Sequence, residues 1–441
     1  MKDNSTLSQH QPEIDSKTNR RILQNIIFLL AGKLVSDFGS FVYAFVMGLF
    51  VLKETGSGLG FSAVLIFNMI PRVILGPFAG VIADKINRKK IIITTDILSG
   101  LSLLLLYGIS VFAGFNIVYI YLLSALLAVY NTFFDVSFNA SIPDLVNRKR
   151  ITKVNSYYES IVSFSQIVSP IIGGVIFGLI DIKLFLLFTG ITFLISALSE
   201  SFIDFNVLRE KKNTEKETKK KIKKQSAVDF RSMFGEIKEG FGYIKTQSAI
   251  FTLFIFALGI NFLIALGIEV PVPFIVNEVL ELTPTQFGII SGAFPVGIFV
   301  GSIVLSALPE FKKKYKLFTV ALFIDSIGVL LCGIPGINIF GNHLNDMFFF
   351  FYTGLYFLLG FVVIFVNVPI RTMLMTTIEE QYRGRVFGVI RSLSSVITPA
   401  GLLLSGLLIE YVPAFIIPMF AGVVQVLMIV LFSSNKAIRT L

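Results

Sequence analysis

Twelve apolar runs of about helix-spanning length decide what this chain can fold into. A helix needs about 20 apolar residues to cross the roughly 30 Å hydrocarbon core of a bilayer. Only 15% of the residues are charged and 54% are hydrophobic, against about 25% charged in ordinary soluble domains. The sequence therefore predicts an all-α membrane protein with twelve transmembrane helices, at approximately 24–52, 59–83, 91–113, 117–140, 157–179, 184–203, 249–275, 286–308, 317–335, 347–371, 386–409 and 415–433.

The basic residues between these runs predict the orientation. An even number of spans puts both chain ends on one side, and the loops on the opposite side hold only Lys53 and Lys183. Because Lys and Arg accumulate in cytoplasmic loops, both termini are expected to be cytoplasmic. The same bias explains the net charge of +10, so anionic membrane lipids are the expected counter-charge and no nucleic-acid partner is needed.

The polar segments divide the chain into five parts. Residues 1–21 form a cytoplasmic tail without the features of a signal peptide, and 434–441 form a second tail. Two six-helix bundles, 22–203 and 248–433, are joined by a linker at 204–247 whose basic stretch KKNTEKETKKKIKKQ is too charged to form a core. The end of that linker predicts an amphipathic helix on the inner membrane surface or the helix ends, with apolar residues at Phe230, Phe234, Ile237, Phe241 and Ile244.

A weak internal repeat relates the two bundles. A shift of 229 residues matches Ile161 to Ile390, Ser165 to Ser394 and Pro170 to Pro399. These residues belong to the fifth run of each half. Two pseudo-symmetric bundles around a site at the bilayer midplane are typical of a secondary transporter.

Several other classes of protein are disfavoured. Cys332 is the single cysteine, and His10 and His343 are too few for a histidine metal site. The chain has no phosphate-binding loop and no motif of an intramembrane enzyme. We therefore expect no metal or other cofactor and no catalytic residue, and uphill transport would be driven by an ion gradient.

The joint GVIADKINRKK at 80–90 contains an acid that topology does not explain. Acids contribute little to orientation, yet Asp84 lies directly before the basic residues that begin the third run. The joint resembles the G-x-x-x-D-[RK]-x-G-[RK]-[RK] loop of the major facilitator superfamily, through Gly80, Asp84, Lys85, Arg88 and Lys89. Asn87 stands where that family has glycine. The resemblance implies a conformational latch in which the aspartate approaches the positive N-terminus of the eleventh helix.

Further motifs resemble the macrolide-efflux branch of bacterial drug exporters within that superfamily. They cover essentially residues 22–433 and include Ser36 with Gly39, Thr55-Gly56-Ser57, Pro71, Gly76-Pro77, Asp96 and the EGFGYI stretch. The resemblance implies export of a drug-like compound across the plasma membrane of a bacterium by a monomer.

The fifth run carries a modified exporter motif. The family pattern G-x-x-x-G-P-x-x-G-G appears here as Ser165, Ser169, Pro170, Gly173 and Gly174. The resemblance implies antiport, whereas small residues and a proline are also explained by ordinary close helix packing. The family often has an arginine in the fourth run for proton coupling. This chain has none there, so proton coupling would need another arrangement.

Ionisable residues inside the spans are the candidates for coupling or substrate binding, because each is costly in a membrane. Asp37 lies one turn from Lys33 and either forms a neutralising pair with it or takes a proton or a cationic substrate. Glu269 precedes Pro271-Val-Pro273 and either takes part in gating or reaches the outer headgroups.

Two further candidates have a structural and a functional reading. Asp135 pairs with Arg148 or Lys149, or acts as a coupling group. Arg72 packs against Asp37 or Asp135, or recognises an anion. For Asp96 and Asp325 a structural role is expected. Some of the 46 phenylalanines must line the cavity of an all-helical bundle, and aromatic walls suit a bulky amphiphilic ligand.

Together these features predict a secondary transporter that exports an amphiphilic compound, such as a macrolide-type drug, in exchange for protons. The alternatives are an importer or uniporter of a small metabolite, and a non-transporting membrane immunity or receptor protein.

Overall fold

The computed structural model describes residues 16–146, 148–204, 230–309, 314–337 and 345–434. These residues contain twelve helical spans that are long and apolar enough to cross a membrane, which confirms the predicted all-α membrane fold. The first half contains α1 (Ser16–Thr55), α2 (Gly58–Lys85), α3 (Arg88–Phe112), α4 (Ile117–Leu145), α5 (Arg148–Leu179) and α6 (Ile182–Ser201). The second half contains α9 (Ser248–Gly267), α10 (Pro271–Phe274), α11 (Pro284–Ala307), α12 (Lys314–Leu331), α13 (Asn345–Thr377), α14 (Glu380–Ile409) and α15 (Ile416–Ser434).

Short polar caps begin several of these helices. The side chains of Asn87 and Asn116 accept hydrogen bonds from the first turns of α3 and α4. Thr283 and Gln286 form a reciprocal capping box at the start of α11. Such caps satisfy backbone N–H groups that have no partner within the helix. Short turns therefore separate the long spans, and their polar side chains satisfy some of the backbone donors at the helix starts.

The seventh span is broken between α9 and α10. α9 ends at Gly267, and Pro271 and Pro273 begin a short helix that continues as a π-helical turn over Ile275–Val279. Proline has no N–H to donate and its ring disfavours an uninterrupted helix. The sequence PVP thus explains the break.

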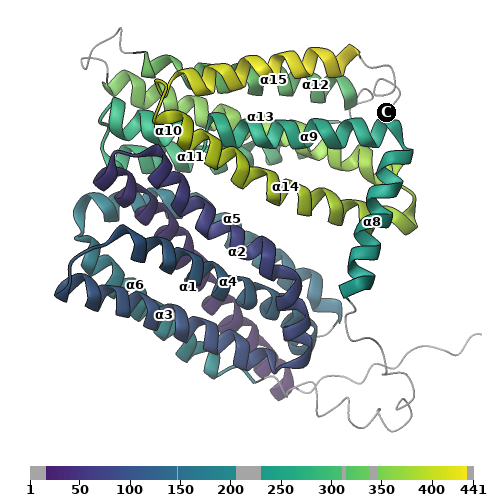
Figure 1. The fold of residues 1–441 in the computed structure, drawn as a ribbon. Coiled ribbons are helices and arrows are strands. Elements are labelled where there is room, and N and C mark those ends of the chain that lie inside the picture. The colour runs from purple at the N-terminus through teal and green to yellow at the C-terminus, as the bar shows by residue number, and fades with distance from the viewer. Residues whose placement is uncertain (1–15, 147, 205–229, 310–313, 338–344, 435–441) are drawn as a thin grey trace, which may run out of the picture.

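The two halves meet along two pairs of helices. α5 packs against α11, and α2 packs against α14. We call the side on which α1 begins and α15 ends the tail side, and the opposite side the distal side. The halves meet at the end that carries α10, which is distal, and their ribbons diverge toward the end that carries α8 (Figure 1).

α8 (Phe230–Thr246) packs on the tail-side ends of α9 and α14. The Tyr243 ring stacks on Tyr382 with centroids 4.4 Å apart, and Arg385 binds Glu239 at 3.0 Å. A Cβ on Gly240 would lie 2.9 Å from the Arg385 carbonyl oxygen, so the two helices are in close contact. Residues 205–229 of the predicted linker lie outside the described part of the chain.

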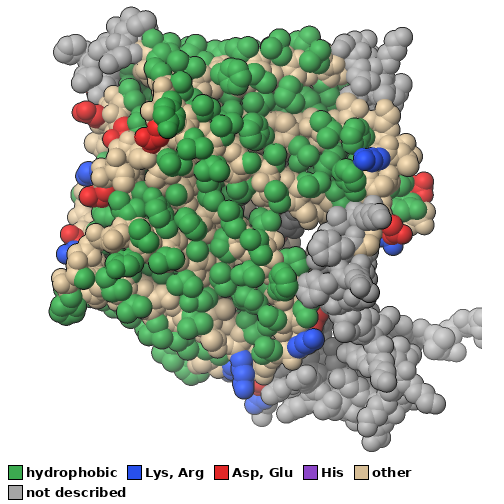
Figure 2. Space-filling model, in the orientation of Figure 1, with side chains coloured by type: hydrophobic (Ala, Val, Ile, Leu, Met, Phe, Trp, Pro, Cys, Tyr) green, Lys and Arg blue, Asp and Glu red, His purple; other side chains and the backbone are tan. Residues whose placement is uncertain are grey.

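The exposed surface is apolar over most of the face in Figure 2, and charged side chains gather near its two ends. Many large hydrophobic side chains of the described residues are exposed, among them Leu105 at 66% and Leu431 at 72%. An apolar surface this extensive indicates contact with lipid rather than water.

Candidate functional site

A buried ion cluster of Lys33, Asp37 and Asp135 joins α1 to α4. The Lys33 Nζ donates to Asp37 Oδ1 at 2.6 Å and to Asp135 Oδ1 at 2.5 Å. Lys33 is only 1% exposed, whereas the side chains of Asp37 and Asp135 are 16% and 36% exposed. The lysine is therefore buried in the protein, whereas the two carboxylates are partly exposed, Asp135 more than Asp37.

Aromatic rings surround the lysine on its remaining sides. The Nζ lies 5.0 Å from the Phe134 ring centroid and 5.5 Å from those of Phe138 and Tyr158. Ring faces stabilise a cation that has lost water. The Lys33–Asp37 contact matches the pairing alternative drawn from the sequence. Asp135 also contacts Lys33, because α4 lies beside α1 at this depth and the long lysine side chain spans the gap.

Two more acids lie behind this cluster, between α1, α3 and α6. Ser36 donates to Asp96 Oδ1 at 3.0 Å, and Asp96 and Glu200 are each 1% exposed. Within the described part of the chain, Asp96 Oδ2 and Glu200 Oε2 have no hydrogen-bond partner. A Cβ on Gly32 would lie 2.7 Å from the Glu200 carboxylate. Glu200 is not among the candidates predicted from the sequence, although an acid at the end of an apolar run was the available signal.

Arg72 and Glu269 are not part of the buried ion cluster. Arg72 is exposed on α2, and among the described residues it forms no ion pair within 4 Å. Glu269 lies at the break between α9 and α10 in the other half.

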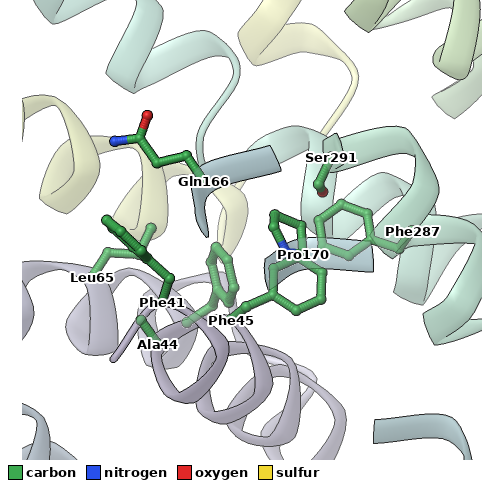
Figure 3. Close-up of a pocket in the computed structure, with 9 residues that line it drawn as sticks. Phe41, Ala44, Phe45, Leu65, Gln166, Pro170, Phe287 and Ser291 are labelled. Carbon is green, nitrogen blue, oxygen red and sulfur yellow. The ribbon is translucent and has the colours of Figure 1, made fainter. Parts of the chain in front are cut away.

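An apolar cavity of about 270 Å³ lies between the halves. It is drawn in Figure 3, and its walls come from α1, α2, α5 and α11: Phe41, Ala44, Phe45, Phe61, Leu65, Gln166, Pro170, Phe287 and Ser291. The rings of Phe45 and Phe287 stack across the two halves with centroids 5.4 Å apart. Phe41 follows Asp37 by one helical turn, so the cavity and the buried ion cluster occupy neighbouring levels of α1.

The α5 motif forms close contacts on two of its faces. A Cβ on Gly173 would lie 2.8 Å from the Phe45 ring of α1, and Ser165 and Ser169 are fully buried at helical spacing from it. A Cβ on Gly174 would collide with the Pro284 carbonyl oxygen and lie 3.0 Å from Gly288 Cα. Small residues thus let α5 approach α1 and α11 at backbone distance.

The Gly174–Gly288 contact is reciprocal. A Cβ on Gly288 would lie 2.5 Å from the Pro170 carbonyl oxygen. The α5 and α11 backbones therefore touch with no side chain between them, on the distal side of the cavity.

A second distal contact joins α2 to the end of α14. Ser57 Oγ donates to Glu410 Oε1 at 2.6 Å, and a Cβ on Gly58 would lie 2.9 Å from Ile409. The Gly406 backbone packs against Ser62. With the α5–α11 contact, this gives two contacts between the halves on the distal side.

The residues of the joint make their contacts within the first half. Arg88 donates to Asp144 at 2.7 Å, to Asp84 at 3.3 Å and to the carbonyl oxygen of Ala140 at 2.6 Å. Lys89 donates to the carbonyl oxygens of Ser201 and Ile203 at the end of α6. Asp84 remains 66% exposed on its side chain. Lys85 is also exposed, and a Cβ on Gly80 would meet no atom within 4 Å.

The known proteins with a similar sequence include efflux proteins. Macrolide efflux protein A of Streptococcus pyogenes is 22% identical over 377 residues, which cover 86% of this chain and 87% of that protein. A multidrug efflux pump of Mycolicibacterium fortuitum is 24% identical over 405 residues, which cover 86% of this chain and 88% of the pump.

Solved transporter structures share the fold. A bacterial homologue of the iron transporter ferroportin, in an inward-facing state, superposes with a TM-score of 0.68 at 17% identity and covers 94% of this chain and 99% of its own. A nucleoside transporter superposes with a TM-score of 0.65 at 14% identity, and the match covers 94% of this chain and 98% of that transporter. The sequence model of the Major Facilitator Superfamily matches residues 29–401. Over nearly its whole membrane-embedded length, the chain belongs to the Major Facilitator Superfamily of membrane transporters.

Proposed function

We propose that this transporter exports a bulky amphiphilic compound, of the macrolide-drug kind, in exchange for protons. The observation that carries the proposal is the buried ion cluster beside the apolar cavity. One lysine lies between two carboxylates, so the cluster has a net charge of −1 when all three groups are ionised. This net negative charge would let the cluster bind one more positive charge.

A proton and a cationic substrate group would compete for this site. Asp135 is the more exposed carboxylate, and a proton or an ammonium group reaches it without breaking the Lys33–Asp37 bond. The apolar cavity holds the remainder of an amphiphile through its phenylalanine rings. Binding of the substrate would then release the proton, which is the exchange step of an antiporter.

The arrangement of the halves supports loading from the tail side. The distal contacts are closed, and the halves diverge toward α8. If the tail side is cytoplasmic, as the basic loops predict, this state takes up substrate from the cytoplasm or inner leaflet. The names of the efflux relatives support the same direction.

The distal-open state would use the latch formed by Gly80, Asp84, Lys85, Arg88 and Lys89. Asp84 is exposed at the end of α2, and the N-terminus of α14 has no side-chain capping bond at Glu379. An acid is stabilised at such a positive helix end. Closure of the tail side would bring the carboxylate to that end.

Proton movement in inside-out vesicles tests the proposal. Vesicles with an imposed pH gradient receive macrolides and other lipophilic drugs one at a time. The control variant is Asp346→Asn, because Asp346 is an exposed acid at the start of α13. Wild-type protein and this control should dissipate the gradient with at least one compound. Asp37→Asn and Asp135→Asn should not.

Two results would contradict the proposal. If labelled compounds cross the membrane without proton movement, the protein is a uniporter or uses another ion. If both variants still exchange protons at the wild-type rate, the buried ion cluster is not the coupling site.

A further inference from the structure

A carboxylate joins the distal ends of α2 and α14 across the boundary between the halves. Ser57 Oγ accepts a hydrogen bond from Gly60 N at 3.0 Å, within the first turn of α2, and donates to Glu410 Oε1 at 2.6 Å. The N–H of Leu59 donates to the same carboxylate oxygen at 3.4 Å. Glu410 of the second half therefore binds the N-terminal turn of a helix of the first half.

The position of Glu410 in its own helix is electrostatically unfavourable. It is the C-cap residue of α14, and the carbonyl groups at a helix C-terminus carry a partial negative charge that favours a cation. The N-terminus of α2 carries the opposite partial charge. The acid is thus stabilised by the partner helix and not by its own. This stabilisation exists only while the two helix ends lie together.

Close packing behind the carboxylate holds the two helix ends near each other. A Cβ on Gly58 would lie 2.9 Å from the Ile409 side chain, and one on Gly406 would lie 3.0 Å from the Gly58 carbonyl oxygen. Apolar packing of this kind has little directional preference. The bond of Ser57 to Glu410, in contrast, requires donor and acceptor to lie within hydrogen-bond distance. It is therefore lost when the distal ends of α2 and α14 separate.

The opposite end of the same helix pair has a similar arrangement. α2 and α14 pack against each other and run antiparallel, so α2 ends on the tail side, where α14 begins. Asp84 lies in the last turn of α2, and the start of α14 has no side-chain capping bond at Glu379. Each helix thus carries an acid at the end where its own dipole disfavours it and where the other helix begins.

We propose that Glu410 is a positioning residue that holds the distal-closed state of the transport cycle. When the distal side opens, the Glu410 contact with α2 breaks, and Asp84 would gain its contact with the start of α14. The loss of one contact is then offset by the gain of the other, which keeps the two states close in free energy, as a two-state equilibrium requires. The exchange of contacts rests on the latch in the proposed function, whereas the role of Glu410 depends neither on the substrate nor on proton coupling.

Charge reversal at Glu410 tests this role. Glu410→Lys places a cation at the positive end of α2, where it is repelled, and at the negative end of α14, where it is favoured. The probe is Ser291→Cys, labelled by a membrane-impermeant maleimide added on the distal side of oriented vesicles. Because hydrogen bonds to charged groups are stronger than neutral ones, labelling in Glu410→Lys should be about fivefold faster or more. Glu410→Ala, which removes the bond without repulsion, should give a smaller acceleration.

Two comparisons distinguish positioning from a structural role. Denaturant unfolding in detergent should show no loss of stability in Glu410→Lys, because the lysine suits the C-terminus of α14. The matched control is Glu54→Lys, since Glu54 is an exposed acid in the last turn of α1, on the same side of the protein. This control should label within twofold of the wild-type background.

Three outcomes would overturn the proposal. Labelling of Glu410→Lys at the wild-type rate shows that the contact does not hold the distal ends together. Equal acceleration in Glu54→Lys assigns the effect to charge on the distal surface in general. A loss of stability that accompanies faster labelling makes Glu410 a structural residue of α14. Since none of these measurements involves a drug or a pH gradient, failure of the proposed antiport would leave their results unchanged.

Discussion

The two halves share a backbone plan but differ in what their interiors contain. The first half buries Lys33 with Asp37 and Asp135, and also buries Asp96 and Glu200. In the described part of the second half, Asp325 is buried without an ion pair within 4 Å, and the ion pairs of Arg383 and Arg385 lie at the tail-side ends. The two halves thus share the packing of six helices, whereas most of the buried ionisable side chains lie in the first half.

The proposed function gives the two halves distinct tasks. In it, charge exchange belongs to the first half, where buried ions interact strongly because little water screens them. The second half supplies apolar walls, such as Phe287 in the cavity, and the glycine surface of α11.

Removal of the buried lysine should have the largest effect. Lys33→Met leaves two carboxylates together without their cation, and breaking a buried pair in this way costs about 3–5 kcal/mol. We expect a corresponding loss in the free energy of unfolding, measured by denaturant unfolding in detergent, and no detectable transport. Lys53→Met removes an exposed lysine and should change stability by less than about 0.5 kcal/mol. Equal stability of the two variants would show that the lysine does not tie α1 to α4.

The same substitution in the two halves should give opposite results for proton coupling. Asp37→Asn should reduce drug-induced proton movement at least tenfold, because it removes a charge from the buried ion cluster. Asp325→Asn neutralises a buried acid of the second half and should stay within twofold of wild type. The measurement is the rate of gradient dissipation in vesicles. A tenfold loss in Asp325→Asn would refute the assignment of coupling to the first half.

A methyl group in the α5–α11 contact should open the distal side. The added Cβ of Gly174→Ala meets backbone atoms of α11, whereas the Cβ of Gly178→Ala lies 3.5 Å from Thr285 Oγ1, an ordinary contact. Overpacking costs about 1–3 kcal/mol, here specifically in the distal-closed state. We expect distal thiol labelling of a Ser291→Cys probe to accelerate severalfold with Gly174→Ala and not with Gly178→Ala. Cys332, the single native cysteine, is buried, so it adds little background labelling.

Loss of the latch aspartate should have the smallest effect on stability. The Asp84–Arg88 pair is exposed, and such pairs contribute about 0–1 kcal/mol. Asp84→Asn should therefore unfold within about 1 kcal/mol of wild type. It should nevertheless slow distal labelling of Ser291→Cys, because the proposed contact with α14 exists only in the distal-open state. Unchanged labelling would leave Asp84 with a role in topology or folding alone.

Local features of this fold were predictable from sequence, whereas contacts between distant helices were not. Span length and hydrophobicity fix the twelve helices, and the four-residue spacing of Lys33 and Asp37 places them on one helix face. The contact of Lys33 with Asp135 crosses 102 positions in sequence and depends on how α4 lies against α1. The position of Glu200 likewise depends on tertiary packing, because α6 places its carboxylate against Gly32 of α1.

The α5 motif illustrates the same limit. Its small residues predicted close packing, but the spacing alone does not tell which neighbour each residue meets. Gly173 contacts α1 within the same half, and the adjacent Gly174 contacts α11 of the other half. One position along a helix rotates the side chain by about 100°, since a turn takes about 3.6 residues. Neighbours in sequence thus serve two different interfaces.

The bare contact of α5 with α11 has a mechanical consequence. Interdigitated side chains must withdraw before two helices can tilt, but Pro170, Gly174 and Gly288 offer backbone surfaces with nothing to withdraw. Such a contact would let one half rotate against the other while the distance between the α5 and α11 axes stays nearly constant. The glycines would then allow movement of one half against the other as well as close approach of the two helices.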